Sequence, residues 1–248
     1  MVFHGELGSS TWTEIDQQLR TEQSGPALTL LVPVGSTEQH GPHLPLDTDS
    51  RIAGELARAT AERLAPVAHA RRWAVAPAIA YGASGEHQSF PGTVSIGTDT
   101  LSRVLLEYGR SACCWAQRVV FVNGHGGNVA ALAHAVPQLR AEGRDVVWIA
   151  AAVADADAHA GHTETSLLLH LSPEQVRVDR RGPGNRAPLA ELLPQLRRDG
   201  VATVSPLGVL GDPTTATARE GRRLFADMVD SAVAAVHSWS PGPAGMLR

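Results

Sequence analysis

Four mostly apolar runs, separated by longer amphipathic stretches, constrain the fold of this chain more than any other feature. They lie at residues 27–36, 73–82, 118–128 and 145–154. Runs of this kind are typical of strands that are buried on both faces of a sheet. Because strands that alternate with helices form parallel sheets through right-handed crossovers, the pattern predicts an α/β fold with a mostly parallel sheet.

The stretches between these runs predict the helices that cover the sheet. Apolar residues recur there at helical spacing over residues 49–64, 99–116, 129–143 and 217–239. Pro137 interrupts the third helix, and Thr217 with Glu220 forms a capping-box pattern in the last one. No repeat or low-complexity linker divides the chain, so we expect one domain over residues 1–239 and a flexible tail over 240–248.

Composition narrows the class of protein. Of 248 residues 43% are hydrophobic, which is enough for a sizeable core, and the net charge of −4 argues against a nucleic-acid or anionic-membrane partner. All 21 basic residues are arginine, which excludes lysine-dependent chemistry. Cys113 and Cys114 are expected to be buried rather than bridged. The chain lacks the pattern of a signal peptide or membrane span, so we expect a cytoplasmic protein.

Three stretches rich in acidic, imidazole and glycine residues follow predicted strands, at 35–50, 123–128 and 155–166. Because open α/β sheets bind ligands at the carboxyl ends of their strands, these stretches should converge on one edge. Together they offer carboxylates and imidazoles without a thiolate: Glu38, His40, Asp49, His125, His159 and Glu164. Such a set suits Zn²⁺, Mn²⁺ or Fe²⁺, and a bridging carboxylate would allow two ions.

Each of these acidic residues also has a simpler interpretation. Asp49, or its neighbour Asp47, fits the N-cap of the following helix. Glu164 fits a cap at the start of its own helix. Glu38 and His40 fit a solvated turn. Only their shared position at strand ends favours a metal site over these local interpretations.

The remaining polar residues have simpler interpretations as well. The glycine-rich segment 124–127 is compatible with a phosphate-binding loop, although it lacks the spacing of the dinucleotide-binding motif. His159 and His162 are compatible with an exposed surface. His87 or Phe90, in the segment 85–93, is expected either near a substrate or as support for that loop.

Four segments follow one another along the chain: PVGSTEQHGPHLPLDTD, GEHQSFPGTVS, VNGHGGN and HAGHTETSLLL. The ordered set resembles the creatininase family of metal-dependent amidohydrolases, and the resemblance runs from about residue 28 to about residue 236. It implies a three-layer α/β/α sandwich and a centre with two divalent metal ions per subunit. It also implies a homo-oligomer, because many members form closed assemblies.

The resemblance implies roles for individual residues. Four of them are implied as ligands of the two ions, with Zn²⁺ or Fe²⁺ favoured and Mn²⁺ possible: Glu38, His40, Asp49 and His125. Asp49 is the implied bridge, and His159 is the implied catalytic histidine. Creatininase proper has a further carboxylate where this chain has Gly127, and we expect Glu164 to supply that missing metal ligand.

The substrate also follows from the resemblance. Residues 184–221 resemble the branch that accompanies mycofactocin biosynthesis, whose members are peptidases that remove a C-terminal Val-Tyr dipeptide from a modified precursor peptide. Ala158 stands where creatininase proper has another acid, which argues against creatinine. The sequence therefore predicts a metal-dependent peptidase. The alternatives are a small-molecule amidohydrolase that acts on a cyclic amide or formamide, and a metal-binding scaffold without catalysis.

Overall fold

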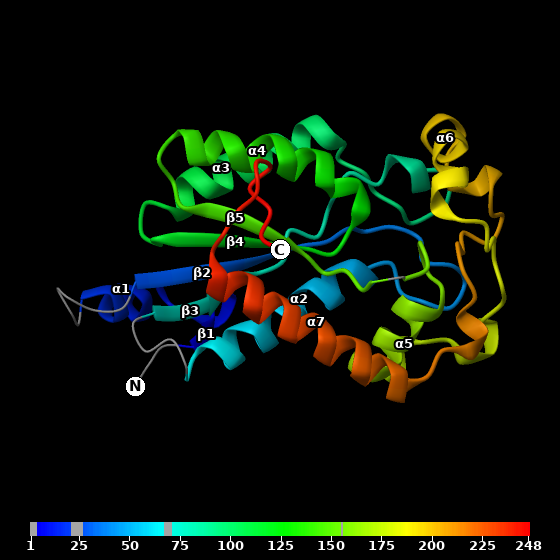
Figure 1. Ribbon diagram of the computed structural model, residues 1–248, viewed down its shortest axis with the longest axis horizontal. Helices are drawn as coiled ribbons and strands as arrows, with labels where there is room; N and C mark the ends of the chain where they lie inside the picture. The colour runs from blue at the N-terminus through cyan, green and yellow to red at the C-terminus, as the bar shows by residue number, and fades with distance from the viewer. Residues whose placement is uncertain (1–3, 21–26, 67–70, 155) are drawn as a thin grey trace.

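A five-stranded parallel sheet forms the centre of the molecule (Figure 1). The computed structural model describes residues 4–20, 27–66, 71–154 and 156–248. The strands are β1 (His4–Glu6), β2 (Ala27–Val34), β3 (Arg71–Val75), β4 (Arg118–Asn123) and β5 (Val146–Ala150). They lie in the order β1-β3-β2-β4-β5, and every neighbouring pair is parallel. The predicted α/β class with a mostly parallel sheet is confirmed.

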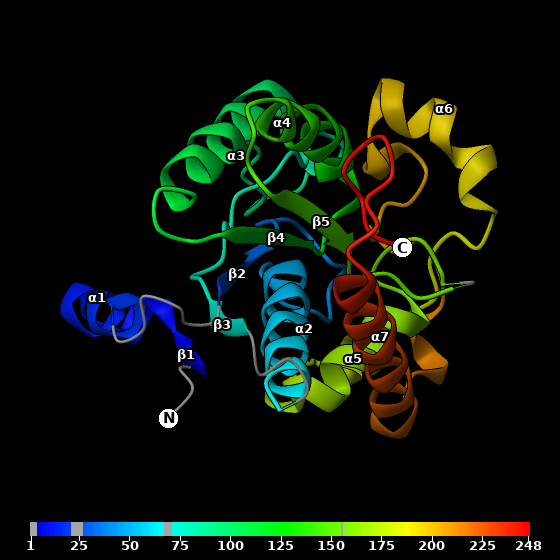
Figure 2. The same ribbon diagram turned by 60° about the vertical axis from the view of Figure 1, so that its left-hand side comes forward.

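Helices cover both faces of this sheet, which gives the predicted three-layer α/β/α arrangement (Figures 1 and 2). On one face lie α3 (Thr98–Ala112) and α4 (Val129–Ala141), and on the other lie α2 (Thr48–Leu64), α5 (His162–Leu171) and α7 (Ala218–Ser238). α1 (Trp12–Arg20) lies beside the β1 edge, and α6 (Leu189–Asp199) lies beyond the carboxyl ends of the strands. No helix of the described ranges combines the length and apolar character that a membrane span requires.

The strands are apolar on both faces because each face packs against its own helical layer. In β2, Leu30 and Val32 belong to the core under α3 and α4, whereas Leu31 belongs to the core under α2 and α7. In β4, Phe121 belongs to the core under α3 and α4, and Val120 belongs to the core under α2 and α7. Two-sided burial explains why these runs lack polar alternation.

Two prolines produce outcomes that differ from the sequence prediction. The run at 73–82 forms a regular strand only as far as Val75, because Pro77 has no N–H to give to the ladder. The chain still follows β2, since Ile79 N donates to Pro33 O at 2.9 Å. In α4, by contrast, the helix continues through Pro137. Burial of its apolar face against the sheet outweighs one lost hydrogen bond.

The last residues pack onto the sheet, contrary to the expectation of a flexible tail over 240–248. Trp148 N in β5 donates to Gly245 O at 3.1 Å, and Leu247 N donates to Trp148 O at 2.9 Å. Leu247 is 2% exposed. Both cysteines are free, as expected, but the expectation that they are buried was wrong, because Cys114 is exposed and Cys113 is half-buried.

Candidate metal centre

The topology creates a crevice at the carboxyl ends of β2 and β4. These strands are neighbours, but the helices that follow them, α2 and α4, pack on opposite faces of the sheet. The two connections therefore diverge, and open α/β sheets bind ligands at such a point. The segment after β2 contributes residues 35–49 and the segment after β4 contributes residues 124–128.

Glu38 lies at the bottom of this crevice and is 0% exposed. Neither of its carboxylate oxygens has a hydrogen-bond partner among the described residues. Its nearest charged neighbour is His125, whose Nε2 lies 3.2 Å from Glu38 Oε2. A buried carboxylate without hydrogen bonds costs free energy unless a positive charge compensates it. The interpretation of a solvated turn is therefore wrong for this residue.

Asp49 holds the two histidines of the crevice together. Its Oδ1 lies 3.1 Å from His40 Nε2, and its Oδ2 lies 3.3 Å from His125 Nδ1. Ser36 Oγ donates to the same Oδ2 at 2.7 Å. The N-cap position of α2 belongs to Asp47, so Asp49 is not the cap of the helix. Its central place agrees with the predicted bridging role.

The ring nitrogens that face the centre are directed by the other contacts of each histidine. His40 Nδ1 donates to Glu38 O at 3.1 Å, which leaves Nε2 to face Asp49 and Glu164. Metal-bound histidines normally donate their second ring nitrogen to a carbonyl or carboxylate in this way. Asn123 Nδ2 donates to His125 O at 2.8 Å and holds the turn that follows β4.

Glu164 and His159 reach the same centre from the segment before α5. Glu164 Oε2 lies 3.9 Å from His40 Nε2 and accepts a hydrogen bond from Ala160 N at 2.6 Å. Ala160 has a φ of 52°, uncommon for a residue other than glycine, and it turns the chain between the two side chains. His159 Nδ1 lies 3.8 Å from Glu38 Oε1. All six residues singled out from the sequence therefore converge.

Two further residues of the centre come from the segment GEHQ, which sequence reasoning left without firm roles. His87 is buried, with Nε2 3.5 Å from Glu38 Oε1. Glu86 is 32% exposed at its side chain, with Oε1 3.6 Å from His125 Nε2. A Cβ at Gly127 would lie 2.3 Å from Ala83 O and 3.0 Å from Glu86 Oε1, so no side chain fits at that position.

Two other histidines of the described residues, His43 and His162, have their contacts away from the centre. His43 is buried, and its Nε2 lies 2.8 Å from Thr165 Oγ1 in α5, which makes it a link between the loop and the helix. His162 Nδ1 lies 2.8 Å from Thr215 Oγ1 in a different pocket. The sequence did not show which of its histidines lie at the centre and which lie elsewhere.

The electrostatics of the centre divide the histidines into two classes. Burial disfavours the charge on His40, but Asp49 and Glu164 outweigh it and raise its pKa to about 10. Burial also disfavours the charge on His125, but Glu38 and Asp49 outweigh this effect and raise its pKa to about 9. In the absence of an ion, these two rings carry protons that neutralise the surrounding carboxylates.

The second class is neutral. Burial lowers the pKa of His87 to about 3, and the nearby charges of His125 and His40 add to that effect. Burial also lowers the pKa of His159 well below its usual range, with His40 and His87 adding to it. Glu38 responds in the opposite sense, since burial raises its pKa to about 7.

These observations fit a divalent metal centre. Three sets of side chains each bring potential ligand atoms within 4.8 Å of one another: Glu38, His40 and Asp49; His40, His159 and Glu164; and Glu38, His87 and His159. The donors are oxygen and nitrogen, which suits Zn²⁺, Fe²⁺ and Mn²⁺. Glu38 supplies the decisive sign, because neither of its buried carboxylate oxygens has a hydrogen-bond partner among the described residues.

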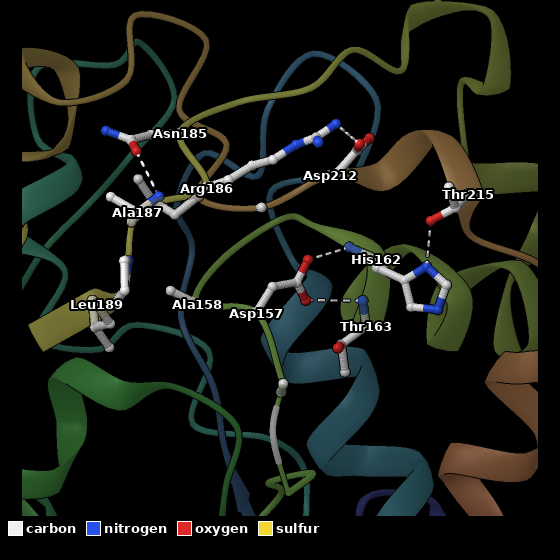
Figure 3. Close-up of a pocket in the computed structure, with 14 residues that line it drawn as sticks. Asp157, Ala158, His162, Thr163, Asn185, Arg186, Ala187, Leu189, Asp212 and Thr215 are labelled. Atoms are coloured by element: carbon white, nitrogen blue, oxygen red, sulfur yellow. Dashed lines mark hydrogen bonds and ion pairs between the residues drawn. The ribbon is translucent and has the colours of Figure 1, made fainter.

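A separate pocket, shown in Figure 3, is lined by Ala158, the residue that precedes His159. His159 pairs with Leu210, and Ala158 and Leu210 both line the pocket, which has a volume of about 520 Å³. Arg186 forms an ion pair with Asp212 across it. The volume falls within the range of ligand pockets, about 300–1,000 Å³.

Comparison with known proteins agrees with the geometry. The profile of the creatininase family, described as creatinine amidohydrolase, matches residues 8–236. The chain belongs to the creatininase family. It is therefore a hydrolase of C–N bonds. At 63% identity it is similar to the mycofactocin precursor peptide peptidase of Mycobacterium ulcerans (strain Agy99), with 98% of this chain and 95% of the relative covered.

Solved structures of creatininase share the fold. One titled "Creatininase Mn" has a TM-score of 0.75 at 25% identity, with 97% of this chain and 100% of that chain covered. A mutant creatininase titled "Zn-Zn type" has a TM-score of 0.73 at 25% identity, with 95% and 98% covered. These titles name manganese and zinc for those proteins.

Proposed function

We propose that this chain is a metal-dependent peptidase that hydrolyses an amide bond of the modified mycofactocin precursor peptide and releases its C-terminal Val-Tyr dipeptide. The observation that carries the metal dependence is Glu38, a fully buried carboxylate with two unpartnered oxygens. The similarity to the peptidase of Mycobacterium ulcerans over nearly the whole chain supports the substrate. We place this activity in a single cytoplasmic domain that assembles as a homo-oligomer.

The residues present would hold two divalent ions. Glu38 and His125 would bind one of them, His40 and Glu164 would bind the other, and Asp49 would bridge both, since it contacts both histidines. Two ions bound in this way would lower the pKa of a coordinated water and polarise the amide carbonyl. Zn²⁺ and Fe²⁺ suit the donor set best, and Mn²⁺ is compatible with it.

The side chains supply the proton transfer. His159 is neutral at pH 7 because burial lowers its pKa, so it is able to accept a proton from the water that attacks the amide carbonyl. It then donates that proton to the nitrogen that leaves when the amide bond breaks. Burial of its ring excludes bulk water, which would otherwise compete for the proton.

The pocket of Figure 3 offers room for the peptide beside the reacting bond. Ala158 lines it, and the next residue, His159, points into the metal centre. We infer that an extended peptide occupies this pocket and places its amide bond at the centre. A larger residue at position 158, such as the acid of creatininase proper, would reduce this room.

The test is mass spectrometry of the modified precursor peptide after incubation with the protein. The chelated protein is reconstituted separately with Zn²⁺, Fe²⁺ and Mn²⁺, and metal content is measured in each sample. We expect release of Val-Tyr only with metal, and the most active ion is then the assigned cofactor. An intact peptide in the presence of bound metal would favour the alternative, an amidohydrolase of small cyclic amides. Release that survives complete chelation would refute the metal dependence.

A further inference from the structure

Gln39 lies between His87 and His159, and its amide is held in one orientation by the backbone. The side chain is buried. Gln39 Oε1 accepts a hydrogen bond from Gly41 N at 2.8 Å, and Gln39 Nε2 donates to Gly208 O at 3.0 Å. A backbone N–H only donates and a carbonyl oxygen only accepts, so these contacts decide which end of the amide is nitrogen.

The loop at Gly208 is shaped around this amide. Gly208 has a φ of +76°, and a Cβ added there would lie 1.9 Å from Gln39 Oε1. Neither the backbone conformation nor the space allows a side chain at this position. The amide is therefore held by two hydrogen bonds and by steric contact, and it is unable to rotate.

The backbone of residue 39 fixes the hydrogen on His159. His159 Nε2 lies 2.8 Å from Gln39 O, and because a carbonyl only accepts, Nε2 carries the hydrogen and donates it. In a neutral imidazole the other nitrogen is then unprotonated. That nitrogen, Nδ1, is the one that lies 3.8 Å from Glu38 Oε1 in the centre.

The side chain of residue 39 fixes the hydrogen on His87. The amide nitrogen has two hydrogens, and one of them is donated to Gly208 O. His159 Nε2, at 3.1 Å, has no lone pair to accept the second one, because it already carries a hydrogen. The second hydrogen therefore goes to His87 Nδ1 at 2.8 Å. His87 then carries its own hydrogen on Nε2, which faces Glu38.

We propose that Gln39 is a positioning residue that gives the two histidines opposite roles: His159 presents an unprotonated nitrogen to the centre, and His87 presents an N–H donor. The catalytic consequence of these two roles rests on the proposed function. An unprotonated Nδ1 is suited to accept a proton. An N–H donor is suited to bind an oxygen that gains negative charge when an amide carbonyl is attacked.

The first test measures the tautomers directly and needs no peptide. Long-range ¹H–¹⁵N NMR spectra of the full chain, labelled with ¹⁵N at histidine, identify the protonated nitrogen of each ring. The spectra are recorded for the metal-free and the Zn²⁺-loaded protein, and the variants His87→Gln and His159→Gln assign the signals. We expect hydrogen on Nε2 and none on Nδ1 in both rings. A hydrogen on Nδ1 of either ring would overturn the proposal.

The variant Gln39→Glu separates the two histidines. A carboxylate cannot donate to His87 Nδ1, so we expect this ring to move its hydrogen to Nδ1 and to lose its donor toward the centre. The tautomer of His159 should stay unchanged, because its partner is the backbone oxygen of residue 39. The variant should lower kcat by about 10–100-fold with a smaller change in KM. An unchanged His87 tautomer in folded Gln39→Glu protein would contradict the role of the amide.

A pair of variants at position 87 tests the donor without changing Gln39. In His87→Gln the side-chain nitrogen is able to occupy the place of Nε2, whereas His87→Leu has no donor. We expect the glutamine variant to retain at least about tenfold more kcat than the leucine variant at equal metal content. Equal values would overturn the donor role. If no Val-Tyr is released by any protein, the NMR result still tests the tautomers, so failure of the two proposals is distinguishable.

Discussion

The metal centre and the pocket beside it differ in how their charges are balanced, although the adjacent residues Ala158 and His159 contribute to them. In the pocket the protein satisfies its own charges, since Arg186 pairs with Asp212 and Asp157 accepts from Thr163 N at 3.0 Å. In the centre Glu38 has no hydrogen-bond partner among the described residues. The comparison teaches that the centre is built for a cation, whereas the pocket offers shape and room.

The largest effect should come from Glu38. In Glu38→Gln, which keeps the volume of the side chain, we expect metal content and turnover to fall below detection, because the variant removes an anionic metal ligand. The melting temperature of the metal-free protein should not decrease, since the variant no longer buries an unpartnered carboxylate. Glu55→Gln, at an exposed carboxylate of α2, is the matched control. Normal metal content in Glu38→Gln would contradict the assignment of this ligand.

The next largest effect should come from His159. We expect His159→Ala to keep its metal and to lose about 10²–10⁴-fold in kcat, because general acid–base catalysis contributes that much. His237→Ala, at an exposed position of α7, controls for nonspecific effects. Turnover is measured on the modified peptide and metal by elemental analysis. A His159→Ala protein with normal turnover would remove the residue from the mechanism.

The pKa values of the ligands predict how metal affinity depends on pH. His40 and His125 have pKa values of about 10 and about 9 in the metal-free protein, so both rings carry protons at pH 7.5. An ion must displace these protons, and its affinity should therefore rise with pH up to about 9, by about tenfold per unit for each proton released. Calorimetric titration with Zn²⁺ in two buffers of different ionisation enthalpy measures the release. Equal heats in both buffers would show that no proton leaves.

The smallest effect should come from the pocket, where charges are already paired. We expect Ala158→Trp and Arg186→Ala to raise KM for the peptide by about tenfold or less while kcat and metal content stay near normal, because they alter binding and leave the centre intact. Steady-state kinetics on the modified peptide measures this. If KM changes in neither variant, the peptide follows another path to the centre.

Much of the fold was predictable because burial leaves a direct trace in the sequence. A strand covered on both faces is apolar at most positions, and β2, β4 and β5 show this pattern apart from Thr29, Arg118 and Asn123. The predicted capping box at Thr217 is confirmed in part: its side chain accepts from Glu220 N at 3.2 Å, whereas its own N–H donates to Ser166 Oγ. The C-terminal residues were not predictable in this way. Leu247 is buried because the chain happens to return to the edge of β5, which its local sequence does not indicate.

By itself, the sequence determined the layered architecture and the set of side chains that meet at the strand ends, since both follow from periodicity and from short, ordered segments. Only the tertiary structure decided that Asp49 contacts two histidines and that the oxygens of Glu38 accept no hydrogen bond from the described residues. The same holds for Gln39, whose amide contacts a histidine 48 residues away and another 120 residues away. The physical reason is that burial and hydrogen bonding depend on neighbours that are distant in the chain, and these become neighbours only when the sheet is formed.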